Sequence, residues 1–107
     1  MDNIKYDIVN LSNSILKKFN VPTFHETIPS LDEVIKSSNK VVLILLDAFG
    51  KNIIEKHLDE SSFIRKHFFE TIKATYPPTT VASTNGMLSA RYPIENGWMG
   101  WSQYFNK

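Results

Sequence analysis

The strongest hydrophobic pattern in the chain is an unbroken apolar run from Val41 to Leu46, which leads directly into Asp47. A run of this length, rich in branched side chains, is typical of a strand buried on both faces of a parallel sheet. A buried helix segment is the alternative that the run alone leaves open. Gly50 follows closely and suits a sharp turn. The pattern therefore predicts a central strand with Asp47 at its carboxyl end, where open α/β sheets bind ligands.

A helical pattern precedes this strand. Its apolar positions recur at spacings of four, three and four residues: Ile4, Ile8, Leu11 and Ile15. This spacing predicts an amphipathic helix over residues 3–18, capped by Asp2 or Asn3, with its apolar stripe packed on a sheet. A connector over residues 20–29 follows. Ser30 and Glu33 then fit a capping box that begins a short helix ending near Lys36.

Shorter elements are expected after Gly50. We predict a helix over residues 52–58, a short turn capped by Ser62 that runs through His67, and a second strand over residues 68–74. The chain has three histidines, His25, His57 and His67. Each has polar neighbours, and we interpret all three as surface residues rather than metal ligands.

A second motif runs from Ala74 to Thr84. Pro77 and Pro78 fix an extended approach and exclude a helix before Pro78. The sequence then predicts a helix from Val81 to about Ala90. Gly86 lies inside it, at a cost of about 1 kcal/mol, which indicates that another group packs closely there.

The threonine hydroxyls before this helix have two interpretations. In the simpler one a threonine caps the helix. In the other a threonine is a nucleophile, because the positive end of the helix dipole stabilises an attacking alkoxide and attracts a phosphoryl group. The residues alone leave both interpretations open.

Composition limits the classes of protein and of functional site that remain possible. The chain has 107 residues, 42% of them hydrophobic, with a net charge of +1 and no cysteine. It is long enough for one domain with a modest core, and it offers neither a disulfide nor a thiolate site. Its scattered lysines and arginines do not predict nucleic-acid polymer binding. No signal peptide or membrane-spanning run is visible, so we expect a cytoplasmic protein without a membrane partner.

Three stretches in order carry a family resemblance. They are Asp47-Ala48-Phe49-Gly50 after the apolar run, Tyr76-Pro77-Pro78-Thr79-Thr80-Val81-Ala82-Ser83, and Met87-Leu88-Ser89-Ala90-Arg91-Tyr92-Pro93. Together they resemble the N-terminal part of the alkaline phosphatase superfamily, in its type I phosphodiesterase/nucleotide pyrophosphatase branch. The resemblance covers residues 40–101. It implies an α/β fold, namely part of a parallel-sheet sandwich with flanking helices. Residues 1–107 would then form a single partial domain, with a helical lead-in over 1–39 and the motif region over 40–107.

The resemblance also implies a reaction. A member of this family is a metal-dependent phosphoric ester hydrolase that acts on a small phosphate ester or nucleotide through a phospho-threonine intermediate. Thr80 matches the nucleophile, with Thr79 and Thr75 as alternatives. Asp47 matches a metal ligand, and Thr80 would bond to the same pair of zinc ions. Phosphomonoesterases and phosphosugar mutases of the superfamily are alternatives, whereas sulfatases need a modified Cys or Ser at the nucleophile position.

The sequence also departs from the family pattern. Ser89-Ala90 replaces a Thr-Gly pair, and Asn96-Gly97, a strong turn signal, replaces a His-Gly pair. The other metal ligands of the family lie far downstream, so we expect an N-terminal portion that is nearly inactive alone.

Outside enzymes, the chain would be a small interaction module in which Asp47 and Thr80 only cap helices. Trp98 and Trp101 would favour self-association of such a portion.

Overall fold

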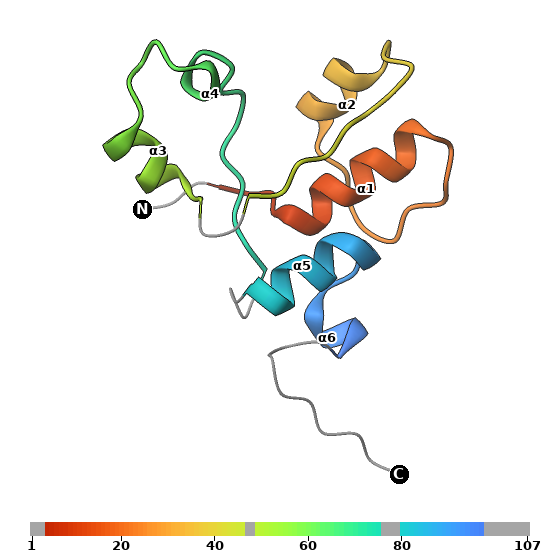
Figure 1. Ribbon diagram of the computed structural model, residues 1–107. Helices are drawn as coiled ribbons and strands as arrows, with labels where there is room; N and C mark the ends of the chain where they lie inside the picture. The colour runs from red at the N-terminus through yellow and green to blue at the C-terminus, as the bar shows by residue number, and fades with distance from the viewer. Residues whose placement is uncertain (1–3, 47–48, 76–79, 98–107) are drawn as a thin grey trace.

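The computed structural model describes residues 4–46, 49–75 and 80–97, with the side chains of Thr80 and Val81 left out. Six helices occur in these ranges, and Figure 1 shows their arrangement. They are α1 (Ile8–Lys18), α2 (Pro29–Ile35), α3 (Lys51–His57), α4 (Phe63–Lys66), α5 (Thr80–Ser89) and α6 (Pro93–Asn96).

The predicted parallel sheet is wrong, because the described residues form helices and no strand. Residues 41–46 are free of helix and pair with no other described segment, and the second predicted strand, 68–74, is reduced to one isolated parallel bridge between Asp7 and Lys73. In this bridge Ile8 N donates to Lys73 O at 3.0 Å and Lys73 N donates to Tyr6 O at 3.1 Å. A branched apolar run favours extended backbone, but a strand also needs a second extended segment beside it.

The first helix begins later than predicted because Asp7 caps it. The Asp7 carboxylate accepts hydrogen bonds from Val9 N at 3.0 Å and Asn10 N at 3.1 Å, while Asn10 Oδ1 accepts one from Asp7 N at 3.0 Å. This reciprocal pair is a capping box built from Asp and Asn. Asp2 and Asn3, the predicted caps, lie outside the described residues.

The buried face of α1 also differs from the predicted one. Ile8, Leu11 and Ile15 of the predicted stripe are only half-buried. The buried positions are mostly polar: Val9, Asn10, Ser12, Asn13 and Ser14. Helix α1 therefore packs through a polar face whose side chains bond to other segments.

Helix α2 begins one residue before the predicted cap. Pro29 is its first residue and Ile28 its N-cap, without a side-chain capping bond. The Ser30 hydroxyl instead donates to the Glu70 carboxylate. A proline at the first helical position loses nothing by lacking an N–H, which explains the start at Pro29.

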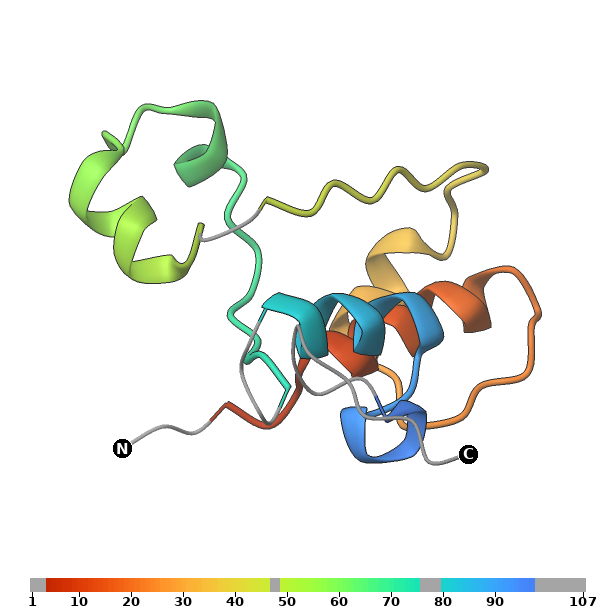
Figure 2. The same ribbon diagram turned by 60° about the horizontal axis from the view of Figure 1, so that its bottom comes forward.

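Four helices form a cluster. Helix α1 packs against α2 and α5, and α5 packs against α6, as Figures 1 and 2 show. We call α1, α2, α5 and α6, with the connector between α1 and α2, the helix cluster. Its buried apolar residues are Val9, Ile28, Ala82, Met87 and Ala90. None of the described helices combines the length and apolar character needed to cross a bilayer.

A second part of the described chain extends away from this cluster and returns to it at Glu70, which accepts the bond from Ser30. We call residues 40–46 and 49–70 the arm; it contains α3 and α4, which lie apart from α1, α2 and α5 in both ribbon views. No described residue of the arm is buried. The predicted cap of α4 is confirmed, because Ser62 Oγ accepts a hydrogen bond from Arg65 N at 3.4 Å. The Asn96-Gly97 turn is also confirmed, since Gly97 ends α6 with a φ of 79°.

Candidate functional site

The predicted nucleophile region contains the start of α5. The helix runs over Thr80–Ser89, so the predicted start at Val81 is confirmed within one residue. Thr80 is thus the first helical residue, at the positive end of the helix dipole. Thr79 and Asp47, the other two residues at the centre of the predicted site, lie outside the described residues.

Thr75, the third nucleophile candidate, lies in a buried position beside α5. Its residue is 3% exposed, and its Oγ1 is 3.1 Å from Ser83 Oγ. The Thr75 backbone N also donates to Ser83 Oγ at 3.4 Å. The pair ties the segment before the prolines to the first turns of α5. A hydroxyl held in this way stabilises the approach to the helix and is shielded from an incoming substrate.

Gly86 provides the close packing that its place in the sequence indicates. A Cβ at this position would lie 3.2 Å from Thr75 Cγ2, 3.3 Å from the Arg91 carbonyl oxygen and 3.4 Å from Val9 Cγ2. The absence of a side chain thus lets α5 approach α1 and the Thr75 segment. This expectation from the sequence is confirmed.

Polar side chains of α1 hold the second half of α5. Ser12 Oγ donates to Met87 O at 2.6 Å, and Asn13 Nδ2 donates to Ala90 O at 3.0 Å. Ala90 has a φ of 57°, which ends the helix in the left-handed region. The two bonds satisfy carbonyl groups that a helix C-terminus leaves without intrahelical partners.

The same face of α1 also holds the connector that leads to α2. Asn13 Oδ1 accepts hydrogen bonds from Phe24 N at 2.8 Å and His25 N at 3.1 Å. Ser14 Oγ accepts one from Ile28 N at 2.7 Å. This role could not be predicted from the sequence, because a buried Asn or Ser can be recognised only when its distant backbone partners are known.

His25 joins the connector to α6. Its Nε2 lies 2.5 Å from Glu95 Oε1, and its ring meets the Tyr92 ring edge-on at 4.6 Å between centroids. The His25 side chain is 28% exposed, so His25 lies partly exposed at the surface and contacts Glu95 there. The backbone N–H of Tyr92 and the His25 side chain both bond to Glu95 and lower the pKa of its carboxyl group. The partner was not visible in the sequence because Glu95 lies far along the chain.

The phenol of Tyr92 is strongly perturbed by its surroundings. Burial, followed by the negative charge of Asp7, raises the pKa of its phenol to about 12. Both causes oppose formation of the phenolate. Tyr92 is therefore a neutral hydrogen-bonding group at physiological pH and is not suited to act as a base there.

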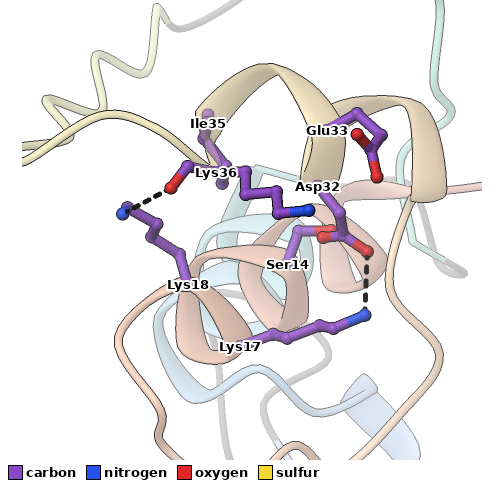
Figure 3. A pocket seen from close by; sticks show the side chains of 7 residues that line it. All are labelled: Ser14, Lys17, Lys18, Asp32, Glu33, Ile35 and Lys36. Atoms are coloured by element: carbon purple, nitrogen blue, oxygen red, sulfur yellow. Dashed lines mark hydrogen bonds and ion pairs between the residues drawn. The ribbon is translucent and has the colours of Figure 1, made fainter.

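A pocket of about 300 Å³ lies between α1 and α2, where Figure 3 shows its side chains. Its lining residues are Ser14, Lys17, Lys18, Asp32, Glu33, Ile35 and Lys36. Asp32 Oδ2 accepts a hydrogen bond from Thr27 Oγ1 at 2.7 Å and lies 3.5 Å from Lys17 Nζ. Asp32 Oδ1 is buried and has no partner among the described residues.

The charges around this pocket nearly cancel. Lys17, Lys18 and Lys36 oppose the carboxylates of Asp32 and Glu33, and the C-terminal ends of α1 and α2 add partial negative charge. Lys18 Nζ donates to Lys36 O at 3.2 Å and so satisfies a carbonyl group at the C-terminal end of α2. The pocket suits a small polar molecule that donates to Asp32, and it has no electrostatic preference for an anion such as phosphate.

Metal-ligand geometry is absent from the described ranges. No group of three or more His, Asp or Glu residues in residues 4–46, 49–75 and 80–97 could hold a metal ion. His57 and His67 are exposed, as predicted. The described residues alone therefore do not fit a two-zinc centre, and the zinc prediction depends on Asp47 and on residues other than those described.

Comparison with known proteins gives no assignment, since no family model, curated protein or solved structure matches the chain.

Proposed function

We propose that the chain carries the nucleophile region of a phosphoric ester hydrolase of the phosphodiesterase/nucleotide pyrophosphatase type. The observation that carries the proposal is the start of α5 at Thr80, directly after the Tyr-Pro-Pro-Thr motif. Helix α5 has ten residues, long enough for an established dipole. The residue at its first position is a hydroxyl amino acid, which this reaction requires.

Thr80 has the central role in this proposal. Its Oγ attacks the phosphorus of a phosphate ester, the bond from phosphorus to the leaving alcohol breaks, and the alcohol leaves with a proton. Water then attacks the phospho-threonine, which releases phosphate or a phosphomonoester and restores the hydroxyl. Thr79 remains the alternative nucleophile, and the burial of Thr75 makes it the weakest candidate of the three.

Zinc is the proposed cofactor, with Asp47 as its ligand from this chain. Zinc would supply Lewis-acid stabilisation of the phosphoryl oxygens and lower the pKa of the nucleophile. A catalytic zinc usually has three protein ligands. Because the described residues add no such cluster, we expect the 107-residue chain to turn over substrate very slowly on its own.

Covalent labelling tests this proposal in the native polypeptide that carries the sequence. We expect incubation with a chromogenic phosphodiester and zinc, followed by acid quench and peptide mass spectrometry, to find on Thr80 the substrate's phosphoryl group, still esterified to its second alcohol. Thr80→Ala should abolish both labelling and turnover, whereas Thr79→Ala, the matched control, should retain both. Full turnover in Thr80→Ala, or a label on another residue, would contradict the proposal.

A second candidate function is an interaction module, and the exposed apolar side chains of residues 41–46 favour it. In this case Thr80 is only the first residue of α5. Thr80→Ala would then change stability by less than about 1 kcal/mol and change no chemistry.

A further inference from the structure

Asn85-Gly86 and Asn96-Gly97 are the two Asn-Gly pairs in the sequence. An Asn-Gly pair is chemically labile, because glycine has no side chain that hinders the attack of its backbone nitrogen on the asparagine amide. The two pairs lie in very different places. Asn85-Gly86 is inside α5, whereas Asn96 is the last residue of α6 and Gly97 is its C-cap.

The surroundings of Gly97 are open. Gly97 is exposed, and a Cβ at this position would meet nothing within 4 Å. Its backbone N donates to Pro93 O at 2.7 Å, at the end of a helix of only four residues. A helix this short opens locally at little cost, because it contains a single turn. Water and base can therefore reach the Gly97 nitrogen each time this turn opens.

Gly86, by contrast, is buried and closely packed. A Cβ at this position would lie 3.2 Å from Thr75 Cγ2 and 3.3 Å from the Arg91 carbonyl oxygen. Gly86 is also in the interior of a ten-residue helix, where each backbone N–H pairs with the carbonyl group four residues earlier. To release this nitrogen, α5 would have to unwind and separate from its neighbours. The packing that positions α5 thus protects the Asn85-Gly86 pair.

The Asn96 side chain is held by Ser89. Asn96 Nδ2 donates to Ser89 Oγ at 3.1 Å, and Arg91 N donates to the same oxygen at 3.2 Å. The Ser89 hydroxyl donates its own hydrogen toward Gly86 O at 3.4 Å and Arg91 O at 3.3 Å. Both lone pairs and the hydrogen of this hydroxyl are therefore in use. This link between α6 and the end of α5 needs a donor at residue 96.

We propose that Asn96 is a site of spontaneous deamidation, and that the reaction loosens the attachment of α6 to α5. The Gly97 backbone nitrogen loses its proton to solvent base and attacks Asn96 Cγ. The bond from Cγ to Nδ2 breaks, ammonia leaves after taking up a proton from solvent, and a succinimide ring remains. Water then attacks one of the two ring carbonyl groups and breaks its bond to nitrogen, which gives aspartate or isoaspartate. Water and base are the only reactants that the chain does not supply.

Either product changes the contact with Ser89. A carboxylate has no hydrogen to donate, so it can bond to Ser89 Oγ only if the hydroxyl turns away from Gly86 O and Arg91 O. Isoaspartate also adds a methylene group to the backbone, which displaces Gly97 N from Pro93 O. The reaction thus adds a negative charge and weakens the joint between two helices in one irreversible sequence of steps.

Timed incubation of the full chain at physiological pH, followed by peptide mass spectrometry, tests the site. We expect Asn96 to convert to the acid at least about 10-fold faster than Asn85, because a single turn opens more often than the packed interior of α5. In urea, where both pairs are unfolded, the two rates should agree within about 3-fold. Equal rates in the folded protein, faster conversion of Asn85, or the same ratio with and without urea would overturn the proposal.

Two variants test the roles of Ser89 and Gly97. Ser89→Ala removes the acceptor of Asn96 Nδ2, and conversion of Asn96 should become about 5-fold faster while Asn85 is unchanged. Gly97→Ala places a methyl group beside the attacking nitrogen and should slow conversion at least about 10-fold, although a φ of 79° strains alanine and loosens the turn. Faster conversion in Gly97→Ala would contradict attack by this nitrogen.

Asn96→Asp reproduces one product and tests the loosening. We expect hydrogen exchange of the Gly97 amide to become about 5-fold faster, because the donor to Ser89 is lost. Asn52→Asp on the exposed surface of α3 is the matched control and should leave this exchange unchanged. Unchanged exchange in Asn96→Asp would contradict the proposed effect on α6.

Discussion

Helix α1 and residues 41–46 have opposite relations between polarity and burial. The buried face of α1 is mainly Asn and Ser, whereas the apolar run from Val41 to Leu46 is exposed. The difference lies in the available partners. The polar side chains of α1 meet backbone groups of α5 and the connector, while the apolar run has no second strand within the described chain. Burial in this molecule is therefore decided by partners and not by polarity alone.

The comparison extends to the regions around these two segments. In the helix cluster, side chains of α1 form hydrogen bonds with backbone groups of α5 and the connector that have no backbone partner. These bonds hold both segments in place. In the arm, helices α3 and α4 are short and none of their described residues is buried. The same substitution should therefore have different effects in the cluster and in the arm.

Asn13→Leu should show the largest difference. Asn13 is fully buried and bonds to Ala90 O, Phe24 N and His25 N. Leucine has a similar volume but leaves these backbone groups without their partner. We expect the free energy of unfolding to fall by about 3 kcal/mol. Urea denaturation monitored by circular dichroism measures this loss.

The matched control is Asn52→Leu on the exposed surface of α3. We expect a change within about 0.5 kcal/mol, because Asn52 has no buried partners. Equal effects of the two substitutions would show that the α1 bonds do not stabilise the cluster.

Gly86→Ala should have the next largest effect. An added methyl group would lie 3.3 Å from the Arg91 carbonyl oxygen and 3.2 Å from Thr75 Cγ2, so α5 would have to move. Alanine improves helix propensity by about 1 kcal/mol, but the close contact costs more, and we expect a net loss of about 1 kcal/mol. At Gly50 in the arm, a Cβ meets nothing within 4 Å, and Gly50→Ala should be neutral within about 0.5 kcal/mol. Thermal unfolding of both variants measures the contrast, and a stabilised Gly86→Ala protein would contradict it.

The sequence predicted much of α5 and little of the burial pattern. Its start near Thr80 follows from Pro77 and Pro78, and the close approach at Gly86 follows from a glycine inside a helical pattern. These features depend on local chemistry, which a single sequence contains. The capping of α1 by Asp7 was missed because Asp2 and Asn3 looked equally suitable.

The sheet and the α1 face were predicted incorrectly for one common reason. Both predictions assumed that apolar positions are buried. The rule fails for Val42 and Ile44 because no strand among the described residues lies beside them. It fails for Asn13 because carbonyl and N–H groups from far along the chain meet its side chain. The local spacing of apolar residues in the sequence does not reveal such long-range partners. The candidate site shares this limit, since Thr80 follows from a local motif whereas the contact between His25 and Glu95 does not.

The stability of the cluster should also depend on pH, and this effect should be smaller. The pKa of Tyr92 is raised to about 12 from an ordinary value of 10.0, first by burial and then by the Asp7 charge. A raised folded-state pKa means that the neutral phenol contributes stability that is fully present below pH 10 and is lost as the pH rises toward 12. Because Tyr92 is only partly buried, solvent screening reduces this contribution, and we expect no more than about 1 kcal/mol.

Absorbance titration of the phenols measures the Tyr92 shift. One of the four tyrosines should ionise well after the others, and Tyr92→Phe should remove this late component. Asp7→Asn keeps a good helix cap but removes the charge, so it should lower the pKa of Tyr92 while α1 remains folded. An unchanged late component in Asp7→Asn would assign the shift to burial alone.

Val42→Thr should have the smallest effect and gives the strictest comparison. Valine and threonine have nearly the same shape, so the substitution mainly replaces a methyl group with a hydroxyl. Val42 is 83% exposed, and we expect the free energy of unfolding to change by less than about 0.5 kcal/mol. Val9 is 0% exposed and packs against Gly86, so Val9→Thr buries a hydroxyl and should cost about 1 to 3 kcal/mol. If Val42→Thr were as costly as Val9→Thr, residues 41–46 would have to be buried within the single chain, and the contrast between arm and cluster would fail.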